Sequence, residues 1–403
     1  MDYYLQVLIG ALVMICIVLP FSNNIKEIKV KNIFYAVIIM FGFGFLLLSN
    51  FVRGFFQVIS DAVAKLSSAT AEGTSFLFGQ LFADYPYAFA LNVLPLIIVM
   101  SCISALLWHW RVLPLMIKGI SYICEKLFNL GGPVSFGAAA NVFVGQVEAP
   151  LFVRPYLSNM SKKELLILMT AGMATVSGSV MIALAGQLEN QFQGINVVQH
   201  FLTASILSIP AAIMYAEIMY PSNELTPSIK NKEDEKIYEG SMDAITKGTK
   251  DGLSIAVNVA AILIAILALV SIVDGFLGLI IKDLSLQAIL GYIFAPICWL
   301  MGIPWDEAIK AAELLGIKLA TNEFVAYIQF SSMDQDIFSD RSKIIVLYSL
   351  CGFANFSSVG ILVSGIGSMA PEKRIDLIQV SGKALLGATL ASCFSGLVAG
   401  LFV

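Results

Sequence analysis

Long stretches without charge constrain the fold of this chain more than any other feature. Several of them reach the roughly 20 apolar residues needed to cross the hydrocarbon core of a bilayer. Charged residues make up 13% of the chain, whereas a soluble domain carries about 25%. We therefore predict an all-α polytopic membrane protein, with spans at Tyr3–Phe21, Ile33–Val52, Phe89–Trp108, Leu165–Leu184, Val198–Tyr220, Leu253–Val273, Ile344–Ile366 and Ile375–Val403. The first span has no basic run before it and no small-residue cleavage site after it, so we interpret it as a retained helix.

The basic residues indicate which loops face the cytoplasm, because cytoplasmic loops carry an excess of Lys and Arg. They lie beside the predicted spans at Lys26, Lys29, Lys31, Arg111, Lys118, Lys126, Lys162, Lys163, Lys230, Lys232, Lys236, Lys247, Lys250, Lys373 and Arg374. The segments 186–196 and 331–340 contain acids and neither Lys nor Arg. This pattern places both termini outside. The topology closes if the segments around 130–158 and 303–332 each enter and leave on one side, so we predict re-entrant hairpins there.

Several classes of function lack their usual residues. The six cysteines are scattered through apolar segments without a CxxC pair, and we interpret them as small buried hydrophobes. His109 and His200 stand at span ends, where a lone histidine is usually interfacial. There is no HExxH, GxSxG or Walker loop, and no Ser–His or paired-Asp constellation for an intramembrane enzyme. We predict no enzymatic activity, and nucleic acid is not an expected partner.

The two halves of the chain resemble each other. "GMATVS" (Gly172–Ser177) lies in a span that follows the first predicted hairpin, and "GFANFS" (Gly352–Ser357) lies in a span that follows the second. Glu148 and Glu323 then occupy equivalent places. An inverted repeat with broken helices and polar groups near the midplane is typical of secondary transporters. We divide the chain into N-terminal helices (1–52), a first repeat (53–220), a cytoplasmic loop (221–240) and a second repeat (241–403).

Glu148 stands between two prolines in "GQVEAPLFVRPY" (Gly145–Tyr156). A hairpin tip leaves backbone groups unpaired, which a membrane tolerates where they line a polar cavity. A functional role is the default interpretation of an ionisable residue there. Glu148 can bind a cation, take up a proton or accept hydrogen bonds from a neutral substrate. The structural alternative is an ion pair with Arg154, although six helical residues would turn the two side chains to different faces.

At these residues the sequence resembles the concentrative nucleoside transporter family. The motifs are Gly145–Met181, "TNEFVAY" (Thr321–Tyr327), "CGFANFSSVGI" (Cys351–Ile361) and "AEGTSFLFG" (Ala71–Gly79), in order through nearly the whole chain. The resemblance implies a homotrimer whose protomers have eight transmembrane helices and two opposed hairpins. It also implies a transport domain that moves against a scaffold containing the long third and sixth spans.

The resemblance further implies the residues of the binding site. Gln146, Val147, Glu148 and Val180 would meet the nucleobase. Glu323, Asn355 and Ser358 would hold the ribose hydroxyls, and Phe353 would pack beside the nucleoside. An amide offers a donor and an acceptor to a base edge, whereas a carboxylate accepts from a diol. Val147 departs from the family, which commonly has Thr between the Gln and the Glu, so base preference does not carry over.

The family's sodium site would fall on Asn141, Val144, Thr175 and Val176. Side-chain oxygens of Asn and Thr would join backbone carbonyls freed where the helices break, and hard oxygen ligands suit a small cation. Proton-coupled relatives depart from this pattern, so Asn141 favours sodium.

We therefore predict a symporter of the cytoplasmic (inner) membrane that imports uridine-like nucleosides, and purine nucleosides as a further class, with sodium as coupling ion. A proton-coupled symporter is the alternative. A channel is a rival class, against which two opposed occluding hairpins argue. The expected partners are the nucleoside, sodium, the lipid bilayer and two further copies of the chain.

Overall fold

The computed structural model describes residues 3–84, 89–188, 191–192, 194–224, 226, 237–282 and 284–403. The predicted all-helical class is confirmed for these residues, which contain helices and no strand. The helices are α1 (Tyr3–Cys16), η1 (Leu19–Phe21), η2 (Ile25–Glu27), α2 (Val30–Leu48), η3 (Asn50–Val52), α3 (Arg53–Phe78), α4 (Gln80–Asp84), α5 (Phe89–His109), α6 (Val112–Phe128), α7 (Gly132–Ala140), α8 (Glu148–Leu151), α9 (Arg154–Leu157), α10 (Lys162–Ala174), α11 (Gly178–Leu188), α12 (Val197–Met219), α13 (Ser241–Ile280), α14 (Leu286–Leu300), α15 (Trp305–Ala320), α16 (Glu323–Ser332), η4 (Gln335–Ile337), α17 (Asp340–Leu350), α18 (Phe356–Met369), η5 (Pro371–Lys373) and α19 (Arg374–Leu401).

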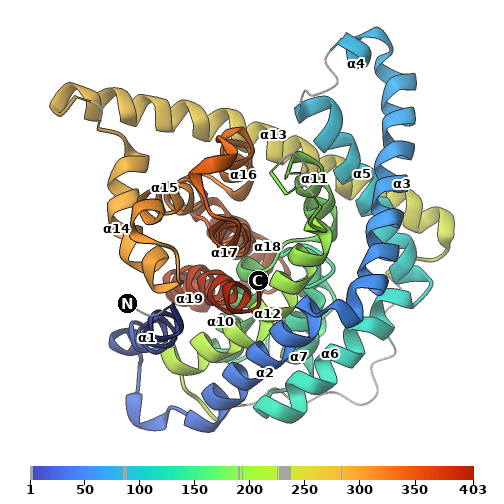
Figure 1. The fold of residues 1–403 in the computed structure, drawn as a ribbon. Helices are drawn as coiled ribbons and strands as arrows, with labels where there is room; N and C mark the ends of the chain where they lie inside the picture. Colours follow the sequence, from blue (N-terminus) through green and yellow to red (C-terminus); the bar gives the residue numbers. More distant parts are fainter. Residues whose placement is uncertain are drawn as a thin grey trace.

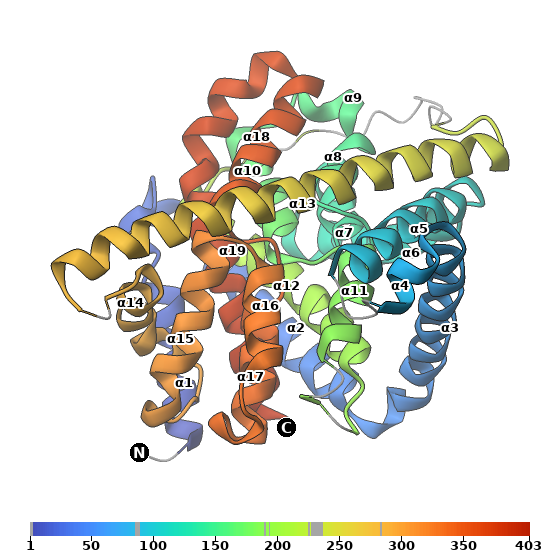
Figure 2. The ribbon, with the colours of Figure 1, turned by 90° about the horizontal axis from the view of Figure 1, so that it is seen from above.

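Helices α10, α12, α17 and α19 form the centre of the molecule and pack against one another. α12 is buried on nearly all its sides, and α19 is buried almost without interruption from Gly387 to Gly400. A helix that is apolar all round can be stable only when other helices or lipid surround it. Both ends of the chain lie at one edge of the molecule in Figure 2.

A crossing of α5 and α13 lies at the side of this centre. In Figures 1 and 2, α13 runs across almost the full width of the molecule. Gly248 and Gly252 of α13 meet α5 so closely that a Cβ on Gly252 would lie 2.8 Å from the Ile98 Cα. Small residues four positions apart let two membrane helices approach closely. The predicted span Leu253–Val273 is part of one continuous helix of 40 residues that begins at Ser241.

Two predicted spans are each divided by a break. Leu165–Leu184 falls on α10 and α11, and Ile344–Ile366 falls on α17 and α18. The break after α17 contains Gly352, whose φ of +106° is a left-handed conformation that glycine accommodates best. A Cβ on Gly352 would lie 2.6 Å from the carbonyl oxygen of Ala174, the last residue of α10. The two breaks therefore cross in direct backbone contact.

Each break is preceded along the chain by a pair of short helices joined at a carboxylate. In the first pair, α7 ends at Ala140, an irregular turn follows, and Glu148 begins α8. In the second, α15 and α16 are joined by Thr321 and Asn322, and Glu323 begins α16. Asn322 caps α16 by accepting a hydrogen bond from the backbone N–H of Val325 at 3.1 Å. The same order of elements thus occurs in both halves.

A buried ion pair ties three of the helices together. Lys163 of α10 donates to Glu217 of α12 at 2.7 Å and to the carbonyl of Ser222 at 2.9 Å. Asn32 of α2 donates to the same carboxylate oxygen at 3.0 Å. The Lys163 and Glu217 side chains are 3% and 0% exposed, so each charge depends on the other for compensation.

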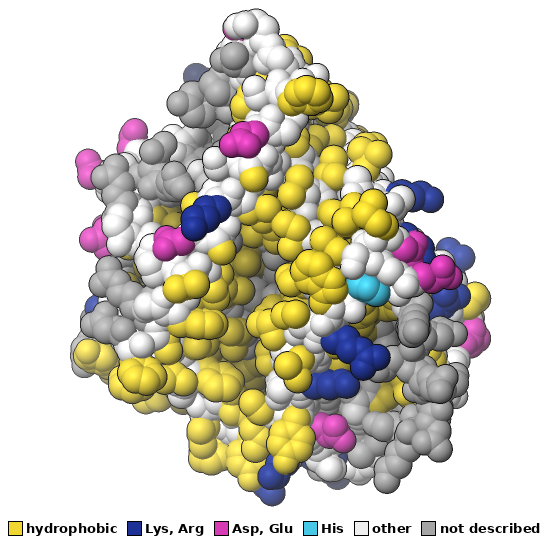
Figure 3. Space-filling view, turned by 90° about the vertical axis from the view of Figure 1, so that its right-hand side faces the viewer, with side chains coloured by type: hydrophobic (Ala, Val, Ile, Leu, Met, Phe, Trp, Pro, Cys, Tyr) yellow, Lys and Arg dark blue, Asp and Glu magenta, His cyan; other side chains and the backbone are white. Residues whose placement is uncertain are grey.

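Five helices in the described part of the chain are long and apolar enough to cross a membrane: Tyr3–Phe21, Val30–Leu48, Ala90–His109, Val197–Met219 and Pro371–Leu401. Large apolar side chains are exposed along α3 and α13, among them Phe55, Val58 and Phe76 on α3 and Ile264, Leu269 and Phe276 on α13. Apolar side chains also spread over the middle of the face in Figure 3. These features fit a multi-pass membrane protein. Of the predicted loop 221–240, residues 225 and 227–236 lie outside the described residues.

Candidate functional site

A chain of hydrogen bonds joins four of the predicted substrate residues. Asn355 caps α18 through its Oδ1, which accepts from the backbone N–H of Ser358 at 2.8 Å. Its Nδ2 donates to Oε2 of Glu323 at 3.1 Å. Gln146 of the first hairpin donates through Nε2 to the Ser358 hydroxyl at 3.1 Å, across 212 positions of sequence. The fold therefore brings the α7–α8 turn, the start of α16 and the α17–α18 break to one place.

This group is buried but retains unused hydrogen-bonding capacity. Glu323 and Asn355 are 4% and 1% exposed. The Gln146 Oε1 is buried and has no hydrogen-bond partner. An unpaired buried acceptor carries a desolvation cost, so such atoms in native structures call for an explanation, and a bound ligand is one. Val180 of α11 and Phe353 of the α17–α18 break are buried apolar residues.

Glu148 stands apart from this chain of hydrogen bonds and is partly exposed. Its carboxylate lies directly against Gly145, where any larger residue would collide with it. No ion pair joins it to Arg154, although both residues are described. The alternative of a structural ion pair is therefore wrong for this structure.

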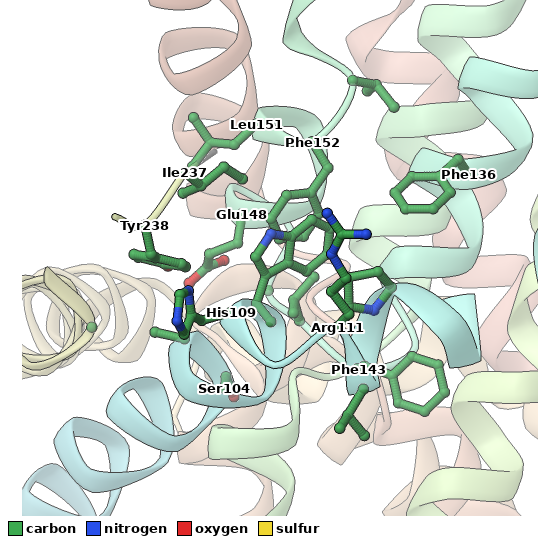
Figure 4. A pocket seen from close by; sticks show the side chains of 18 of the residues that line it. Ser104, His109, Arg111, Phe136, Phe143, Glu148, Leu151, Phe152, Ile237 and Tyr238 are labelled. Atoms are coloured by element: carbon green, nitrogen blue, oxygen red, sulfur yellow. The ribbon is translucent and has the colours of Figure 1, made fainter. Parts of the chain in front are cut away.

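Glu148 instead lines a cavity of about 2040 Å³ between α5, α6, α13 and the segment from α7 to α9. Figure 4 shows Glu148 close to Tyr238, with His109, Arg111 and Phe152 around the same cavity. The Trp108 and Phe152 rings stack with centroids 3.4 Å apart, which links α5 to the segment that follows α8. Sequence reasoning did not single out Trp108, Phe152 or Tyr238, since aromatic residues in apolar segments carry no local signal of a shared cavity.

Val147 is the residue that precedes α8. A Cβ on Gly365 of α18 would lie 3.3 Å from the Val147 Cγ1. The side chain of Val147 therefore packs against α18.

The four residues expected to hold sodium lie at the end of α7 and at the break after α10. Asn141 donates through Nδ2 to the Gly137 carbonyl at 2.9 Å, while its buried Oδ1 has no partner. Thr175 donates to the Ala171 carbonyl at 2.9 Å and keeps its oxygen lone pairs. A Cβ on Gly172 would lie 3.3 Å from Asn141 Oδ1, so the glycine leaves room beside that oxygen. Neutral oxygens with a free acceptor fit a small hard cation.

Val144 and Val176 contribute backbone to the same region. Val144 lies in the turn between α7 and α8 and is 7% exposed. The backbone N–H of Val176 points to the hydroxyl of Ser205 on α12 at 3.5 Å. Ser205 was not among the predicted residues because no motif connects it with the break.

Comparison with known proteins identifies the family. Two family models described as the N-terminus and the C-terminus of Na+ dependent nucleoside transporters match residues 9–81 and 200–400. A third model, described as nucleoside recognition, matches residues 90–191. Together they cover most of the chain.

Similar proteins match over nearly the whole chain. An uncharacterized transporter, YutK of Bacillus subtilis, is 38% identical over 98% of this chain and 98% of its own. The nucleoside permease NupC of Helicobacter pylori is 35% identical over 98% and 97%. Solute carrier family 28 member 3 of Rattus norvegicus is 33% identical, over 97% of this chain and 58% of its own length.

Solved structures of CNTnw share the fold. CNTnw in an inward-facing substrate-bound state superimposes with a TM-score of 0.90 at 34% identity, over 99% of this chain and 98% of that one. A doubly substituted CNTnw in an outward-facing state gives a TM-score of 0.90 at 32% identity, with the same coverage. Along its whole length, in sequence and in fold, this chain therefore belongs to the family of concentrative, Na+-dependent nucleoside transporters.

Proposed function

We propose that this nucleoside transporter imports uridine-like nucleosides, and purine nucleosides as a further class, together with sodium. The observation that carries the proposal is the hydrogen-bond chain from Gln146 through Ser358 and Asn355 to Glu323. It combines a carboxylate acceptor with an amide that retains a free oxygen, which are the groups that a ribose diol and a base edge require.

The roles of the residues follow from their chemistry. Glu323 accepts from the ribose hydroxyls, and Asn355 holds that carboxylate in position while capping α18. Gln146 meets the base through its free Oε1, and Val180 and Phe353 supply apolar contact. Glu148 faces the large cavity, where it contacts the nucleobase as the nucleoside enters the site. A polar site of this kind rejects analogues that lack its partners, because the remaining groups stay buried and unpaired.

Sodium would be held by Asn141, Val144, Thr175 and Val176. The free Oδ1 of Asn141 supports this assignment. When bound, the ion supplies positive charge at the C-terminal end of α10, where helix carbonyls are unpaired. One sodium that enters with a neutral nucleoside gains about 2.3 kcal/mol per 100 mV of membrane potential. This energy corresponds to roughly 50-fold accumulation.

The proposed setting is the cytoplasmic membrane. Both termini would lie outside, three copies of the chain would form a trimer, and each protomer would have eight transmembrane helices with the two hairpins re-entrant from opposite sides. The crossing of α5 and α13 would belong to the fixed scaffold, while the hairpins and the broken helices would move. The repeated order of elements in the two halves supports an alternating-access mechanism.

Uptake of labelled uridine by proteoliposomes tests the proposal. An inward sodium gradient should drive saturable accumulation, and an inside-negative potential should increase it. Full uptake driven by a pH gradient in sodium-free buffer would instead establish proton coupling. Flux that never saturates and never exceeds equilibrium would indicate a channel and refute coupled transport.

A further inference from the structure

Lys318 is a buried lysine that the proposed function does not use. It lies in the last turn of α15, two residues before the helix ends, and is 2% exposed. Its Nζ donates to the carbonyl of Ser349 at 3.0 Å and to that of Cys351 at 3.4 Å. No carboxylate lies within 4.0 Å of this ammonium in the described part of the chain.

The carbonyls that Lys318 contacts belong to the end of a helix. α17 ends at Leu350, and Cys351 is its C-terminal capping residue with an extended backbone. The last carbonyls of a helix have no partner within it and carry partial negative charge. Ser392 of α19 donates to the Cys351 carbonyl at 2.8 Å and completes its hydrogen bonding. The positive charge of Lys318 therefore lies beside the partial negative charge at the C-terminal end of α17.

In the first half of the molecule, the C-terminal end of α10 occupies the corresponding position and also carries partial negative charge. α10 ends at Ala174, and Asn141, at the end of the preceding hairpin helix, directs a free Oδ1 into the interior. There we propose that sodium supplies the charge. In the second half the cation is the ammonium group of Lys318, a residue of α15, and so belongs to the protein itself.

We propose that Lys318 is a fixed internal cation that performs for the second half the role that sodium performs for the first. Its ammonium links the C-terminal end of α15 to the α17–α18 break through hydrogen bonds to the Ser349 and Cys351 carbonyls. Glu323 follows Lys318 by five positions and Asn355 follows Cys351 by four, so this contact sets the distance between the two ribose-binding side chains. Lys318 is therefore a positioning residue for ribose recognition. The inference rests on the proposed role of Glu323 and Asn355.

Nucleoside binding to the purified, full-length protein in saturating sodium tests this role. Lys318→Met keeps the length of the side chain and removes the charge and the N–H donors. Lys310→Met is the matched control, because Lys310 lies on the same helix with a side chain that is 53% exposed. We expect Lys318→Met to weaken uridine binding about tenfold or more and to change 2′,3′-dideoxyuridine binding less than about twofold. The control should behave as the parent does.

A second variant covers the case in which Lys318→Met does not fold. Lys318→Ala purified in ethylammonium chloride should bind uridine, lose affinity when the amine is dialysed away and recover it when the amine returns. Tetramethylammonium, which has no N–H, should not restore binding. Equal losses for uridine and dideoxyuridine in Lys318→Met, unchanged uridine affinity, or no response of Lys318→Ala to ethylammonium would overturn the role of Lys318. A parent protein that does not distinguish uridine from dideoxyuridine would instead overturn the proposed ribose site, which is a separate result.

Discussion

Replacing Glu323 by Gln tests ribose recognition most directly. Glu323 is 4% exposed, and its carboxylate already accepts one hydrogen bond from Asn355 at 3.1 Å. Gln has nearly the same shape, and its amide oxygen can take over the bond from Asn355. The amide then presents N–H donors where the carboxylate presented an acceptor to the diol. The variant should therefore lose at least one charge-assisted hydrogen bond to ribose without a change in packing.

The expected magnitude follows from that single lost bond. A hydrogen bond to a charged group contributes about 1.5–3 kcal/mol, so uridine affinity should fall about 10- to 150-fold. The loss should nearly vanish for 2′,3′-dideoxyuridine, which cannot donate to Glu323. The two ligands and two proteins form a thermodynamic cycle that isolates the interaction of this carboxylate with the hydroxyls.

Isothermal titration of the purified protein in saturating sodium measures all four affinities. Glu372→Gln is the matched control, because Glu372 is exposed on η5 and should leave every affinity unchanged. If Glu323→Gln weakened uridine and dideoxyuridine equally, Glu323 would act on the site as a whole and the ribose assignment would be refuted.

Three further substitutions follow from the structure. Asn141→Ala removes the free Oδ1 at the candidate sodium site, so the half-saturating sodium concentration for uridine uptake should rise about tenfold. Uridine affinity at saturating sodium should stay near that of the parent. Unchanged sodium dependence would exclude Asn141 as a ligand. Val147→Thr replaces one methyl group by a hydroxyl of similar size, and competition by unlabelled adenosine and cytidine against labelled uridine should shift by about 0.5–1.5 kcal/mol. Identical competition profiles would agree with the packing of Val147 against Gly365 and remove it from the base site. Lys163→Met leaves the carboxylate of Glu217 buried without its partner, which should cost about 3–5 kcal/mol of stability and lower the melting temperature in detergent. Lys162→Met is the control, because the Lys162 side chain is 35% exposed and its ion pair with Asp376 lies near the surface, so its loss should change the melting temperature little.

The sequence was sufficient to predict features that depend on local pattern. Apolar runs predicted the helical membrane class, and the distribution of basic residues led us to expect hairpins around 130–158 and 303–332, where the structure has paired short helices. The motifs around Gln146 and Asn355 predicted residues that the fold brings into one hydrogen-bond chain. The prediction of the helical membrane class succeeded because uncharged length is a strong signal in a single sequence.

Features that depend on contacts between distant segments could not be predicted in the same way. Lys318 looks like an ordinary basic residue near a helix end until α17 is placed beside it, 31 positions away. The predicted span Leu253–Val273 is shorter than α13 because the charged beginning of that helix differs in composition from its apolar remainder. The separation of Glu148 from Gln146, two positions apart, depends on the irregular turn before α8, for which the sequence offers no periodicity.

The contact of Gly352 with the Ala174 carbonyl should couple the binding free energies of sodium and nucleoside. The peptide unit that ends α10 adjoins the proposed ion ligand Thr175, and Gly352 precedes Asn355 of the ribose group by three positions. Ordering of one break by its ligand therefore restricts the other through backbone alone, without an intervening side chain. We expect the two ligands to be linked reciprocally: the factor by which sodium tightens nucleoside binding must equal the factor by which nucleoside tightens sodium binding. An alanine at position 352 would force the crossing apart and should reduce both factors together.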